Sequence, residues 1–106
     1  MREMADVTAQ LVDASGDFLV ALRSNEGFQQ DLYDRLVGVL RDCAREWREA
    51  DVVSKLAADV LVSIVPASWA AAESYAEPER QRIMAASFAL YELVGECVYA
   101  DHQFGS

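Results

Sequence analysis

Few side chains in this chain of 106 residues could carry catalytic chemistry. The single histidine, His102, lies four residues from the end of the sequence. Nucleophilic catalysis by serine or cysteine requires a histidine held rigidly beside the nucleophile, and such a terminal position is a poor one. Because no set of nucleophile, base and orienting residue can be assembled, we predict that the protein is not an enzyme.

Metal and cofactor sites are equally hard to assemble from these residues. A di-iron bundle needs Glu-x-x-His pairs, and the sequence contains none. Structural zinc needs clustered Cys and His, whereas Cys43 and Cys97 are far apart along the chain. Glu92 and Glu96 could bring two carboxylates together on one helix, but a solvated strip is the simpler interpretation. With no glycine-rich phosphate loop either, we predict no metal and no cofactor.

Cys43 and Cys97 both fall on apolar stripes, late in the second and fourth predicted helices. In a bundle whose helices alternate in direction, these two helices run parallel and end on the same side. The two sulfurs could therefore lie in one layer, although the sequence leaves their proximity open. Buried reduced cysteine behaves as a small hydrophobic residue, and a cytoplasmic chain should keep it reduced.

The chain is strongly acidic, with a formal net charge of −9 at pH 7. A surface this acidic argues against binding nucleic acid, which requires a basic one. Three acids of the first predicted helix could steer a basic partner, and they are Asp6, Asp13 and Asp17. An acidic inhibitor or immunity-type protein that binds a basic enzyme is therefore one alternative function. A solvated face that serves solubility is the simpler interpretation.

Apolar residues recur at helical spacing along the whole chain, which contains only two prolines and five glycines. We predict an all-α antiparallel bundle of four long helices, in a single domain spanning 1–106. The predicted helices are 5–22, 25–48, one that begins after Asp51 as its N-cap, and 78–100. Ser24 or Asn25 would be the N-cap of the second helix.

The third predicted helix is apolar on most of its circumference, which is typical of a helix at the centre of a bundle. Pro66 lacks a backbone donor, so we predict a kink or a split there, with 66–75 as an alternative separate short helix. Trp69 would then plug the end of the bundle or line a small pocket. A small-ligand-binding domain with a pocket near Trp69 is the second alternative function.

The last predicted helix carries apolar residues on two adjacent sides, only one of which the bundle needs. Apolar residues make up 53% of the chain, more than a domain of this size can bury completely. We therefore predict a non-enzymatic protein–protein interaction module, a homodimer formed through the last helix. Aromatic and Met residues are enriched in interface cores, which places four residues at the contact: Met84, Phe88, Tyr91 and Tyr99.

Two further features bear on the setting of the protein. No uninterrupted apolar run reaches the length of a membrane span, and the first ten residues lack the apolar core of a signal peptide. We therefore expect a cytoplasmic protein without a membrane partner. The chain has eight arginines and one lysine, Lys55, a usage typical of GC-rich bacterial genomes.

Overall fold

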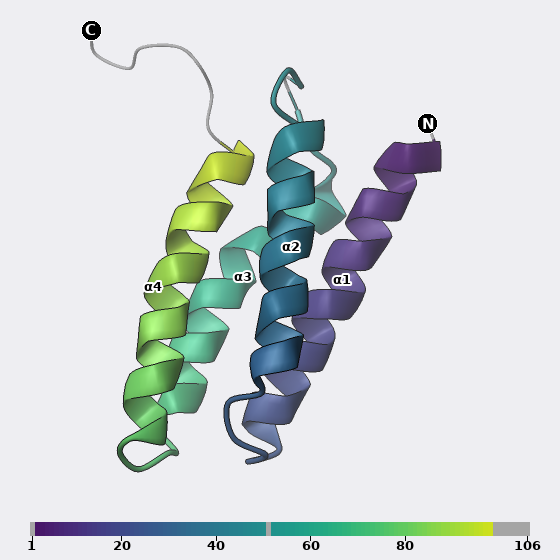
Figure 1. Ribbon diagram of the computed structural model, residues 1–106. Coiled ribbons are helices and arrows are strands. Elements are labelled where there is room, and N and C mark those ends of the chain that lie inside the picture. The colour runs from purple at the N-terminus through teal and green to yellow at the C-terminus, as the bar shows by residue number, and fades with distance from the viewer. Residues whose placement is uncertain (1, 51, 99–106) are drawn as a thin grey trace, which may run out of the picture.

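The fold is a bundle of four long helices, as predicted. The computed structural model describes residues 2–50 and 52–98, with side chains from residue 7 onward. The helices are α1 (Arg2–Arg23), α2 (Gln30–Glu46), α3 (Lys55–Ala72) and α4 (Glu79–Val98), and no strand occurs in the described ranges (Figure 1). The all-α prediction is confirmed.

Consecutive helices run in opposite directions, but the order of the helices around the bundle differs from their order in the chain (Figure 1). α1 packs against α2 and α3, and α4 packs against the same two helices, whereas α1 does not contact α4 and α2 does not contact α3. The parallel pairs α1–α3 and α2–α4 are therefore neighbours. The fold is two antiparallel hairpins packed side by side, which leaves the outer sides of both hairpins uncovered.

Asn25 ends α1 and does not begin α2, which corrects the prediction. It has a φ of 64°, in the left-handed region that asparagine tolerates better than most residues. The amide of Asn25 bonds to the Leu22 carbonyl and that of Glu26 to the Ala21 carbonyl. This pair of bonds is the Schellman motif that closes many helices. As a result α2 begins only at Gln30, with Gln29 as its N-cap.

The start and the middle of α3 also differ from the prediction. Ser54, not Asp51, is the N-cap, and its Oγ accepts a hydrogen bond of 3.1 Å from the amide of Ala57. The helix then continues through Pro66 to Ala72, so it is not split. Pro66 cannot donate to the carbonyl of Val62, and because Val62 is exposed, water can satisfy that carbonyl. The predicted kink stays a prediction.

α3 is not central, and this is the largest correction to the predicted fold. Its buried residues form a single stripe, namely Ala57, Leu61, Ile64, Ser68 and Ala72. Leu56, Val62 and Trp69 are exposed. α3 is also the described helix whose length and composition would suit a membrane span, and 33% of that stretch is buried in the structure. The apolar excess is therefore shared by α3 and α4.

A set of hydrogen bonds joins the α1–α2 turn to the α3–α4 turn. The Tyr75 hydroxyl donates to the Leu22 carbonyl at 2.8 Å and accepts from the Gly27 amide at 3.0 Å. The Glu79 carboxylate accepts from the Phe28 amide. Gly27 has a φ of 90°, and a Cβ there would lie 3.0 Å from Glu79 Oε2, so a larger residue would be both strained and crowded. These bonds fix one hairpin against the other.

Replacing Tyr75 by Phe should lower the free energy of unfolding by about 1–3 kcal/mol, because a partly buried donor and acceptor lose their partner. Urea unfolding followed by circular dichroism measures this change. Tyr91→Phe is the matched control at a protein concentration low enough to keep the chain monomeric, since the Tyr91 side chain is exposed, and it should leave the urea midpoint unchanged there. Equal midpoints for the two variants would contradict the role given to Tyr75.

Candidate functional site

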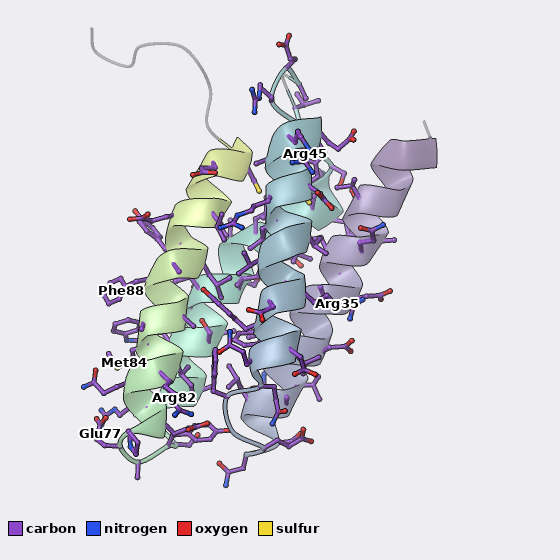
Figure 2. The ribbon with its side chains drawn as sticks, in the orientation of Figure 1. Arg35, Arg45, Glu77, Arg82, Met84 and Phe88 are labelled. Atoms are coloured by element: carbon purple, nitrogen blue, oxygen red, sulfur yellow. The ribbon has the colours of Figure 1, made fainter. Side chains whose placement is uncertain are left out.

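The most distinctive surface is an apolar face formed by one side of the α3–α4 hairpin. Phe88 and Tyr91 of α4 are 62% and 66% exposed, and Val62 and Trp69 of α3 are 68% and 37% exposed. Met84 and Phe88 project from the outer side of α4 (Figure 2). We call this surface the α3–α4 face and define it by six residues: Val62, Val65, Trp69, Met84, Phe88 and Tyr91.

The α3–α4 face contains a pocket of about 270 Å³. Trp69 and Phe88 both line it, and their rings meet edge to face with centroids 5.4 Å apart and planes at 81°. Val65, Ser87 and Tyr91 complete the lining, which is almost entirely apolar. The Ser87 hydroxyl is already engaged with Ser68 Oγ at 2.8 Å and with a backbone carbonyl. The pocket therefore suits an apolar group and lacks the convergent polar groups of most small-ligand sites.

Trp69 does not plug the end of the bundle, contrary to one of the two predicted positions. It lies three residues before the end of α3, on the side that faces α4, where its ring meets that of Phe88. The other predicted position, a pocket near Trp69, matches the hollow described above. Two tyrosines of the chain lie away from this pocket. Tyr75 joins the two turns, and Tyr33 packs with Phe18, their ring centroids 6.0 Å apart.

None of the six residues of the α3–α4 face carries a charge, although the chain as a whole is strongly acidic. Glu92 and Glu96, the acids on the second half of α4, line a different hollow, the α2–α4 groove. Its other charged residues are Asp34 and Arg41 of α2. The described residues contain no group of three or more side chains suited to hold a metal ion.

The predicted acidic residues of α1 are only partly available to a partner. Asp13 and Asp17 are both at the surface, but Asp17 forms an ion pair of 2.8 Å with Arg35 of α2. The side chain of Asp6 lies outside the described residues, as do Tyr99 of the predicted interface and the histidine His102. Late in α2, the exposed side chains of Arg45 and Asp42 form an ion pair with each other.

The two cysteines lie at the same end of the parallel helices α2 and α4. Both are buried and free. The Cys97 thiol donates to the carbonyl of Leu40, one turn before Cys43, at 3.3 Å. Burial raises the pKa of Cys43 to about 12, with a smaller contribution from the nearby Cys97, and burial raises the pKa of Cys97 to about 11. Protonated, buried thiols are poor nucleophiles and poor metal ligands.

These raised pKa values predict a loss of stability in alkali. An unfolded thiol ionises near pH 8.5, whereas the folded thiols keep their protons to about pH 11 and 12. The contribution of the protonated thiols to the free energy of unfolding is therefore complete below about pH 8.5. Above that pH it decreases by about 1.4 kcal/mol per pH unit for each thiol. Urea midpoints between pH 8 and pH 11, compared with a variant carrying Cys43→Ala and Cys97→Ala, measure it. Parallel declines in the two proteins would contradict this expectation.

Sequence reasoning found Phe88 and Tyr91 but missed the contribution of α3 to the same face. The exposed side of α3 was overlooked because an apolar helix was assumed to be central. A usable signal was present, because Val62, Val65 and Trp69 recur at spacings of three and four residues, which places them on one side of the helix. Compared with models of protein families, with curated proteins and with solved structures, the chain shows no match.

Proposed function

We propose that this protein is a non-enzymatic interaction module that forms a homodimer through the α3–α4 face. The observation that carries the proposal is the exposure of Phe88 and Tyr91 beside the packed ring of Trp69. Aromatic side chains are enriched in the cores of interfaces. Contiguous exposed apolar patches of this kind are uncommon on monomeric proteins unless they serve binding.

The size of the apolar face fits the centre of a dimer contact. An aromatic side chain buries about 150–250 Å², so the exposed parts of Trp69, Phe88 and Tyr91 together offer about 300 Å². A stable interface buries about 800 Å² on each partner, with an apolar centre and a polar rim. The three rings therefore supply the centre, and the polar residues around them supply the rim.

The absence of charge on this face favours a second copy over other partners. Two chains of net charge −9 repel each other, and the repulsion is smallest where the contacting residues are neutral. A basic protein would instead gain affinity from an acidic surface such as that of α1. An anionic lipid surface would repel the acidic chain.

Sedimentation equilibrium at micromolar concentration tests the proposal. The expected mass is twice the 11.7 kDa of one chain, with dissociation on dilution. A single species of one chain's mass at every concentration would remove the proposal. A monomer that co-sediments with phosphatidylcholine vesicles would contradict it as well, because it would assign the face to lipid.

A further inference from the structure

A second apolar hollow opens at the end of the bundle where α1 and α3 begin. This hollow, the α1–α3 groove, measures about 560 Å³, and its wall is formed chiefly by Trp47, Val52, Val53 and Leu56. Val52 and Leu56 are 78% and 54% exposed. None of the described residues that line the groove is charged. We propose that the segment 99–106 of the same chain covers this groove, with the ring of Phe104 as its anchor.

The place where α4 ends brings this segment within reach of the groove. Residues 99–106 follow Val98, the last residue of α4, and lie outside the described residues. α2 and α4 end at the same end of the bundle where α1 and α3 begin (Figure 1). Trp47 of the groove wall is the C-cap of α2, and α2 packs against α4. The groove is therefore one to two helix spacings from Val98, about 10–20 Å.

The length of chain selects Phe104 as the residue that enters the groove. Phe104 lies six residues beyond Val98, and six extended residues span about 20 Å. Tyr99, the other aromatic residue of the segment, directly follows Val98, so its backbone stays beside the end of α4. Phe104 is therefore the aromatic residue of this segment that can cross the end of the bundle.

The chemistry of the segment matches that of the groove. Asp101 is the one formal charge among residues 99–106, with the histidine neutral, so docking brings little charge to an uncharged wall. An apolar cavity of about 150 Å³ holds a benzene ring, and the groove of about 560 Å³ has room for the ring and the residues beside it. Phe104 has no polar side-chain atom, so burial of its ring leaves no hydrogen bond unmade.

Attachment to α4 favours this segment over a separate partner. A short flexible linker keeps the attached group at an effective concentration in the millimolar range. A free peptide or a second copy at micromolar concentration has no such advantage. The contact is therefore expected within each chain, whether or not the chain dimerises through the α3–α4 face.

Nuclear Overhauser effects in a uniformly ¹³C- and ¹⁵N-labelled chain test the contact directly. We expect effects between the ring protons of Phe104 and the methyl groups of Val52 and Leu56. In a mixture of labelled and unlabelled chains, filtered for contacts between copies, the same effects should be absent, because the contact lies within one chain.

Matched variants check the contact from both sides. Phe104→Ala should shift the methyl resonances of Val52 and Leu56, because the ring no longer shields them, whereas Gln103→Ala in the same segment should leave them in place. Val52→Asp should remove the effects between Phe104 and Leu56. Val20→Asp, on an exposed position near the other end of the bundle, should keep them. Circular dichroism verifies that each variant is folded, and if Val52→Asp does not fold, the comparison of Phe104→Ala with Gln103→Ala still decides.

Effects within one chain that are lost in Val52→Asp, together with methyl shifts in Phe104→Ala, are the expected result. A Phe104 ring without effects to the groove would overturn the inference, as would methyl resonances that Phe104→Ala leaves unchanged. Effects that arise only between copies would overturn it as well, because they would assign the groove to a second copy. The mass of the chain in sedimentation tests the proposed homodimer separately, so failure of either proposal leaves the other standing.

Discussion

Replacing Phe88 by Asp should raise the dissociation constant of the homodimer at least about 100-fold and leave the subunit folded. Truncation of a central interface residue often costs about 2 kcal/mol or more, and each 1.4 kcal/mol is a tenfold change in affinity. The variant also places an unpaired carboxylate at the centre of the contact, where loss of hydration is costly. A two-fold dimer suffers both losses twice.

Val20→Asp is the matched control for this substitution. Val20 lies on α1, away from the α3–α4 face, and is 55% exposed, close to the value for Phe88. Sedimentation measures association, and circular dichroism with urea unfolding measures folding. Val20→Asp should dimerise like the wild type. Unfolding of Phe88→Asp would show that Phe88 belongs to the core, and equal association of the two variants would show that the α3–α4 face is not the contact.

Phe18→Ala should lower the free energy of unfolding by about 3–5 kcal/mol, the usual cost of removing a fully buried phenyl ring. Phe18 is 1% exposed, and its ring centroid lies 6.1 Å from that of Phe28 and 6.0 Å from that of Tyr33. Because a small domain has only about 5–15 kcal/mol of stability, this single change should remove a large part of it.

Phe88→Ala is the matched comparison for Phe18→Ala, because it removes an exposed ring in place of a buried one. At a protein concentration low enough to keep the chain monomeric, it should change the free energy of unfolding by about 1 kcal/mol or less, since most of the ring already contacts water. Urea unfolding of both variants measures the difference. Similar losses for Phe18→Ala and Phe88→Ala would contradict the separation between a buried core and an exposed contact face.

The helices were predictable because their buried residues repeat with helical spacing. In α2, the buried residues Leu36, Val39, Leu40 and Cys43 are those that the spacing indicates. The ends were less predictable, because residues such as Asn25 and Ser54 can serve at either end of a helix or within a turn. Asn25 closes α1 through its left-handed backbone, and Ser54 takes the cap position expected for Asp51.

The arrangement of the helices could not be derived from their composition. An apolar helix can be central, or it can lie at the edge with an uncovered side, and the sequence of α3 is compatible with both. The structure leaves Val62 and Trp69 exposed because α3 contacts only α1 and α4. The bonds of Tyr75 and Glu79 across the two turns were also unforeseen, since they join residues about 50 positions apart in the chain.

The candidate site was therefore half predictable. Phe88 and Tyr91 follow from a helix with more apolar sides than a bundle uses, which is visible in the sequence. The pocket cannot be predicted from the sequence, because it depends on how Trp69 and Val65 of α3 face α4. Tyr99, the fourth predicted contact residue, lies outside the described residues, so its place in the contact stays a prediction.

The central claim is that the α3–α4 face meets its own copy, and isotope-filtered NMR of a mixed dimer tests it most directly. One half of the chains carries ¹³C and ¹⁵N, and the other half is unlabelled, so filtered nuclear Overhauser effects arise only between copies. The account predicts such contacts from the rings of Trp69, Phe88 and Tyr91. Contacts confined to α1, or none at a concentration where the dimer forms, would contradict it.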